Sequence, residues 1–118
     1  MRAKVTDCLD EVLEYINSAF FSARQILADD LERAVLTIRC LVTRGCIHRS
    51  LDDDTAALRD FTEAAQMARA IGFGAEEASA LSYIGVIETL RGDMLGAEKA
   101  LSRCLNLRME NAMRQLAY

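Results

Sequence analysis

Cysteine and histidine are the residue types in this sequence best suited to metal binding or nucleophilic chemistry. The chain has four cysteines and one histidine, which are Cys8, Cys40, Cys46, Cys104 and His48. No two cysteines have the CxxC spacing of a zinc or redox site, and a single histidine cannot complete a Cys/His ligand set. All four cysteines lie among apolar residues of helical spacing, which favours packed, reduced thiols over a disulfide or a metal site.

No other set of residues has the pattern of a catalytic centre. His48 lies within a helical pattern that favours a packed imidazole over a general base. The acidic run 52–54 lacks the alternating oxygen ligands and the distal glutamate of a calcium-binding loop, so helix capping is the preferred interpretation. The GFG stretch at 72–74 lacks the GK[ST] sequence of a phosphate-binding loop. We therefore expect a non-enzymatic protein without catalytic residues, cofactor or metal.

The triplet Arg91-Gly92-Asp93 has the sequence of a cell-adhesion signal. A glycine followed by aspartate is also suited to ending one helix and beginning the next. The N-terminal segment meets charged residues too early to form the apolar region of a signal peptide. The triplet is therefore predicted to be a turn between two helices.

Composition indicates a helical domain of ordinary globular character. The 118 residues are 52% hydrophobic and 27% charged, with 6 glycines and no proline, which disfavours an all-β chain with many tight turns. The net charge of −4 gives no electrostatic signature of nucleic-acid binding. No apolar run is long enough to span a membrane. We expect a cytoplasmic protein of one domain, 1–118.

The sequence repeats itself at an interval of 40 residues. Shifted by this interval, pairs of identical or similar residues align: Leu41 with Leu81, Gly45 with Gly85, Asp53 with Asp93, Ala57 with Ala97, Phe61 with Leu101, and Ala64 with Cys104. Each copy consists of an apolar-periodic stretch, a short polar interruption and a second periodic stretch. The repeat therefore predicts two helical hairpins, at 31–71 and 75–107.

The segments outside these two copies are also helical in pattern. Residues 1–30 are predicted to form either one long amphipathic helix or the second half of a worn earlier repeat. Residues 108–118 are predicted to form a terminal capping helix, because the end of a repeat array needs a helix to cover its apolar face.

The repeated residues resemble the tetratricopeptide repeat (TPR) family, in a long-period form. That family has a leucine-glycine pair on its first helix, glycine-aspartate at the turn and small residues on its second helix. The resemblance covers about residues 38–107 and implies an all-α fold, in which five to six helices form stacked antiparallel hairpins in a short right-handed superhelix. The chain departs from the family pattern at Arg44, which replaces a leucine, at Glu88, which replaces an aromatic residue, and in lacking the closing proline.

The resemblance also implies a function, because the first helices of such repeats line a concave groove. The implied groove residues are Arg39, Val42, Cys46, Arg49, Ser79, Ser82, Tyr83, Val86 and Thr89. We expect an adaptor or scaffold that binds a peptide or helix of another protein there, with acidic peptides favoured by the two arginines. The alternative is a structural module that forms homo-oligomers through its terminal helices.

Overall fold

The computed structural model describes the backbone of residues 2–26 and 30–116 and the side chains of residues 8–21 and 30–116. Within these residues the regular structure is entirely helical. The five helices are α1 (Arg2–Ile26), α2 (Asp30–Ser50), α3 (Asp54–Ala70), α4 (Gly74–Leu90) and α5 (Met94–Leu116). The predicted all-α class is confirmed, and none of these helices is both long and apolar enough to cross a membrane.

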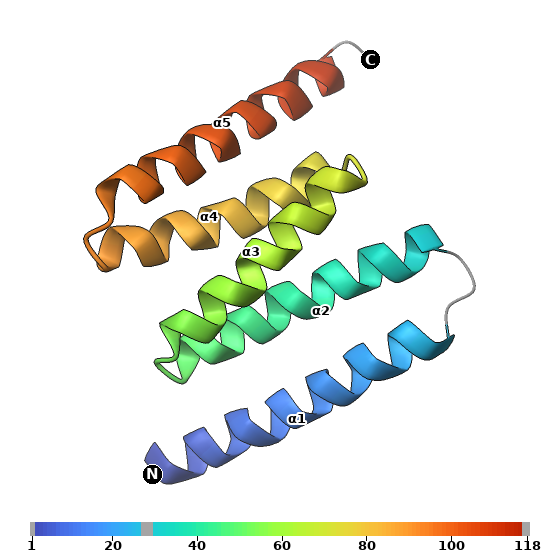
Figure 1. Cartoon of the computed structure of the whole chain (residues 1–118), viewed down its shortest axis with the longest axis vertical. Coiled ribbons are helices and arrows are strands. Elements are labelled where there is room, and N and C mark those ends of the chain that lie inside the picture. The colour runs from blue at the N-terminus through green and yellow to red at the C-terminus, as the bar shows by residue number, and fades with distance from the viewer. Residues whose placement is uncertain (1, 27–29, 117–118) are drawn as a thin grey trace.

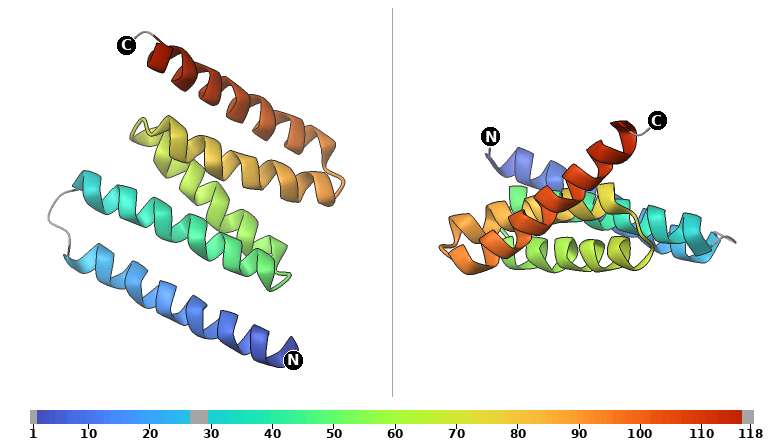
Figure 2. Two further views of the ribbon diagram at one scale, coloured as in Figure 1. Left: turned by 180° about the vertical axis from the view of Figure 1, so that it is seen from behind. Right: turned by 90° about the horizontal axis from the view of Figure 1, so that it is seen from above.

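The helices pack against one another in chain order. Each of the pairs α1–α2, α2–α3, α3–α4 and α4–α5 is in contact. Figure 1 shows α1, α2, α4 and α5 side by side along the long axis of the molecule, with α3 crossing between α2 and α4. The view from above in Figure 2 places α3 to one side of α2 and α4. The result is a stack of hairpins with extents of 49 × 42 × 21 Å, as expected for a helical repeat.

The interval of 40 residues is reproduced in the packing. A Cβ atom added at Gly45 would lie 2.7 Å from Cε1 of Phe61, and one added at Gly85 would lie 2.6 Å from Cγ of Leu101. Phe61 and Leu101 occupy equivalent positions in the two copies, as do the two glycines. In both hairpins, therefore, the missing side chain of glycine lets a large apolar residue of the second helix approach the first helix closely.

The turns of the two hairpins also correspond. The Asp53 side chain accepts a hydrogen bond from the backbone N–H of Ala56 (3.1 Å), and Asp93 accepts one from Gly96 (3.0 Å). These bonds satisfy backbone donors that the first turn of a helix leaves free, so both aspartates are N-caps as predicted. Gly92 has a φ of 83°, and Asp52 adopts 62° at the equivalent position. The triplet at 91–93 is thus the turn between α4 and α5.

The main hydrophobic core lies where α2, α3 and α4 meet. Its largest fully buried side chains are Phe61, Ile38, Leu41 and Ile87. The Phe61 ring stacks on Tyr83 at a centroid distance of 4.8 Å. Alanines of α3 fill the remaining contacts (Ala57, Ala64, Ala65 and Ala68), which allows α3 to lie close to both neighbours.

The structure corrects the prediction for the C-terminal segment. Residues 108–116 do not form a separate capping helix, because α5 continues from Met94 to Leu116. The sequence supplies no glycine or proline after Gly96 to interrupt it. Residues 117–118 of the predicted helix lie outside the described part of the chain. At the other end, α1 is one helix that packs against α2, which fits both alternatives for this segment, and residues 1 and 27–29 of the prediction lie outside the described part of the chain.

Candidate functional site

Arg44, where the sequence departs from the family pattern, belongs to a buried polar cluster. Its guanidinium group donates two hydrogen bonds, of 2.9 and 2.8 Å, to the carboxylate of Asp60 on α3, which is 3% exposed. A third hydrogen bond reaches Asn17 on α1 at 3.1 Å, and the guanidinium lies 5.3 Å from the centre of the Phe20 ring. The hydrogen bonds to Asp60 raise the pKa of Arg44.

His48 belongs to the same cluster. Its Nε2 atom lies 3.6 Å from Oδ2 of Asp60, and its side chain is 20% exposed. Since both oxygens of Asp60 already accept hydrogen bonds from Arg44, the carboxylate is held as a structural partner rather than offered to a substrate. The cluster therefore joins α1, α2 and α3, in keeping with the predicted packing role of His48.

The predicted groove residues of α4 lie together on one side of that helix. Ser79, Ser82, Val86 and Thr89 are spaced three or four residues apart, as one helical face requires. Ser79 and Ser82 are half-buried, and Val86 and Thr89 are exposed. The Thr89 hydroxyl donates a hydrogen bond to the backbone carbonyl of Gly85 (2.7 Å), so its acceptor lone pairs remain available.

Three of the groove residues meet where α2 faces α4. The neighbouring Cys46 side chain, followed by burial, raises the pKa of the Tyr83 phenol, whereas Arg49 lowers it. The structure thus brings Cys46, Arg49 and Tyr83 together. Val42 and Cys46 are half-buried and pack against the edge of the core. Arg39 lies away from this group, beside a hollow of about 470 Å³ formed with Val35, Leu36 and Phe73.

A second surface, which the sequence did not lead us to predict, lies on the opposite side of α4. Glu77, Leu81, Ile84 and Glu88 form the α4 face of two hollows, and their spacing of four, three and four residues places them on one helical stripe. The hollow along the middle of this stripe has a volume of about 430 Å³. The other, at the first turn of α4, has a volume of about 220 Å³.

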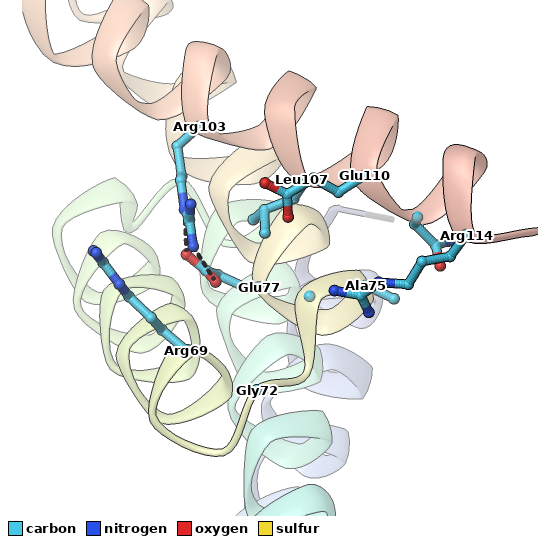
Figure 3. A pocket seen from close by; sticks show the side chains of 10 residues that line it. Arg69, Gly72, Ala75, Glu77, Arg103, Leu107, Glu110 and Arg114 are labelled. Carbon is cyan, nitrogen blue, oxygen red and sulfur yellow. Dashed lines mark hydrogen bonds and ion pairs between the residues drawn. The ribbon is translucent and has the colours of Figure 1, made fainter.

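The two hollows meet and form one trough. Arg69 of α3, Glu77 of α4 and Arg103 of α5 line both of them. Arg103 donates hydrogen bonds of 3.1 and 3.3 Å to the buried Glu77 carboxylate, as the dashed lines in Figure 3 show. The bond to Glu77 raises the pKa of Arg103. We call the surface along α4 between α3 and α5, from Gly74 to Glu88, the α4 trough.

The sequence contained one signal for the trough. This signal is the helical spacing of residues 77, 81, 84 and 88. What the sequence could not show is that α3 and α5 lie on either side of this stripe.

The structure offers no candidate metal centre among the residues it describes, since no three His, Cys, Asp or Glu side chains there are grouped to hold an ion. All four cysteines are free. In comparisons with known proteins, no family model, curated protein or solved structure matches the chain. The fold and surface together define an all-α protein of stacked helical hairpins.

Proposed function

We propose that this chain is a non-catalytic protein–protein interaction module, an adaptor or scaffold of TPR-like architecture. The observation that supports the proposal best is the face shared by α2 and α4. It combines half-buried apolar groups with hydroxyl groups and an arginine, and Cys46, Arg49 and Tyr83 meet at its centre. Such a face can bury apolar side chains of a peptide while its polar groups fix the orientation of that peptide.

The preferred ligand is an extended or helical segment with acidic residues. Arg49 belongs to this face and Arg39 lies beyond it toward the start of α2, and guanidinium groups pair strongly with carboxylates. The hydroxyl groups of Ser79, Ser82 and Thr89 add neutral hydrogen-bonding capacity on α4.

Selection of peptides from a random display library on the immobilised protein tests this proposal. We expect enriched peptides to contain acidic residues and to bind the Arg39→Glu/Arg49→Glu variant at least about tenfold more weakly, because each lost charged hydrogen bond is worth about 1.5–3 kcal/mol. Arg59→Glu is the matched control, since Arg59 is an exposed arginine of α3. Enriched peptides that bind all three proteins equally would exclude this face as the binding site.

A second candidate function is self-association through α5. Large apolar side chains on this helix are exposed: Leu101, Leu105, Met109, Met113 and Leu116. The residues of α3 equivalent to Leu101 and Leu105 are Phe61 and Ala65, which are buried in the core beneath α4. The α5 face is thus suited to packing against a helix of a second copy.

Sedimentation equilibrium distinguishes the two functions. Self-association predicts a molar mass that rises with protein concentration and returns to the monomer value in Leu105→Glu/Met109→Glu. A monomer mass at every concentration would eliminate the second candidate and leave the adaptor proposal unaffected.

A further inference from the structure

The α4 trough has charged groups at both ends and apolar groups between them. Leu81 and Ile84 of α4 form the floor of the central hollow, with Ala65 of α3 and Ala100 of α5 at its sides. Lys99 of α5 also lines this hollow, but the Leu81 and Ile84 floor offers no partner to a charged group, so an occupant gains most by placing apolar side chains against it.

One end of the trough is basic. Three arginines line it, Arg69, Arg103 and Arg114, together with two glutamates, Glu77 and Glu110. Figure 3 shows Arg103 reaching Glu77, Arg69 extending from α3 away from the first turn of α4, and Arg114 extending from α5 toward that turn. Since Arg103 satisfies the Glu77 carboxylate, the other charged groups that line this hollow are Arg69, Arg114 and Glu110, which together leave it one positive charge in excess.

The first turn of α4 adds to the positive potential at the same end. Its N-cap residue is Phe73, and no side chain caps the free backbone N–H groups that follow. The N-terminal end of a helix also carries a partial positive charge. These groups favour a carboxylate at this end of the trough, near Arg114, with Arg69 further along the same lining.

The other end of the trough contains an acceptor that lacks a donor. Oε2 of Glu88 is buried and has no hydrogen-bond partner. It lies against Gly96, where an added Cβ atom would collide with it and would also lie 2.6 Å from Oδ2 of Asp93. A buried carboxylate oxygen without a donor is costly, and the Glu88 side chain also lines the central hollow with Lys99, so this end favours an occupant that supplies a basic or N–H group to Glu88.

From this arrangement we propose that the α4 trough is a binding site for an extended peptide segment with an apolar centre, an acidic residue at the Arg69/Arg114 end and a basic residue at the Glu88 end. The trough follows 14 helical steps of about 1.5 Å each, or about 21 Å, which an extended chain spans with about six or seven residues. Thr62 and Gln66 of α3 line its side and provide hydrogen bonds for the peptide backbone. The site is separate from the α2–α4 face of the proposed adaptor function.

Fluorescence anisotropy with labelled synthetic heptapeptides tests this site. The probes are Glu-Leu-Ser-Leu-Ser-Leu-Lys and the same sequence reversed, because the trough determines the order of the charges in space and leaves the chain direction open. Peptides with glutamate at both ends or lysine at both ends serve as controls. We expect one of the two mixed-charge peptides to bind, and each control to bind at least about fivefold more weakly.

Variants of the protein complete the test. Arg69→Glu/Arg114→Glu changes two exposed side chains, so the fold should persist, as circular dichroism would verify. We expect this variant to bind the mixed-charge peptide at least about tenfold more weakly, and the groove variant Arg39→Glu/Arg49→Glu to bind it as the unmodified protein does. Absence of binding by both mixed-charge peptides, or equal affinity for the unmodified protein and Arg69→Glu/Arg114→Glu, would overturn the proposal. Neither result would bear on the α2–α4 face.

Discussion

Two glycines at equivalent positions differ in the neighbour that each must accommodate. Gly45 faces Phe61, a fully buried ring stacked on Tyr83, whereas Gly85 faces Leu101, whose side chain is 42% exposed. A buried ring has no room to move, but a half-exposed leucine can change its rotamer. The same substitution should therefore have different effects in the two repeats.

We expect Gly45→Ala to lower the free energy of unfolding by about 1–2 kcal/mol, since overpacking typically costs about 1–3 kcal/mol and the gain in helix propensity offsets up to about 1 kcal/mol. Gly85→Ala should remain within about 1 kcal/mol of the unmodified protein for the same reasons. Urea unfolding of both variants measures the difference. Equal losses in the free energy of unfolding would contradict the conclusion that Phe61 is confined whereas Leu101 can move.

Asp60 provides a second test at the residue scale. Its side chain is 4% exposed and pairs with Arg44, whose side chain is 25% exposed. Asp60→Ala should lower the free energy of unfolding by about 2–4 kcal/mol, because removal of one partner leaves the other partly buried charge uncompensated. The double variant Arg44→Met/Asp60→Leu should recover most of this loss. If Asp60→Ala unfolded at the same denaturant concentration as the unmodified protein, the pair would contribute nothing to the stability of the fold.

At the scale of the elements, the turns between paired helices depend on backbone conformation. Gly92 has a φ of 83°, and a Cβ atom added there would have no neighbour within 4 Å. A substitution at this position therefore changes backbone strain without creating a clash. The equivalent Asp52 shows that aspartate is tolerated in this conformation.

We expect Gly92→Val to lower the free energy of unfolding by about 1–2 kcal/mol, the cost of a left-handed conformation for a residue with a Cβ atom. Gly92→Asp should have a smaller effect, because a short polar side chain adopts this conformation more readily. Thermal unfolding monitored by circular dichroism ranks the two variants. If Gly92→Val were more stable than Gly92→Asp, the backbone conformation of the turn would not determine the stability of the second hairpin.

The same elements show what could be predicted from the sequence. Local patterns correctly predicted the two hairpins, a cap within the acidic run 52–54, the cap at Asp93 and the turn at 91–93, because those features depend on neighbouring residues. The pairing of Arg44 with Asp60 was not predicted, since it depends on how α2 crosses α3. The α4 trough was missed for a similar reason, because it arises from the positions of α3 and α5 on either side of α4.

For the molecule as a whole, the two faces of α4 carry different groups of residues. The face toward α2 carries the predicted groove residues, and the face between α3 and α5 carries the trough. Tyr83, Cys46 and Arg49 lie close together, whereas Arg39 lies beside another hollow. Membership in the TPR family and the binding function remain predictions.

The measurement that tests the adaptor proposal most directly is a nuclear magnetic resonance titration of the labelled protein with a peptide enriched by display. The account predicts that amide signals shift along α2 and α4 at Cys46, Arg49, Ser79, Ser82 and Val86. Signals of the solvent-facing side of α3, such as Arg59, should remain in place. Shifts confined to other helices, or none at saturating peptide, would contradict the claim that this face binds a partner segment.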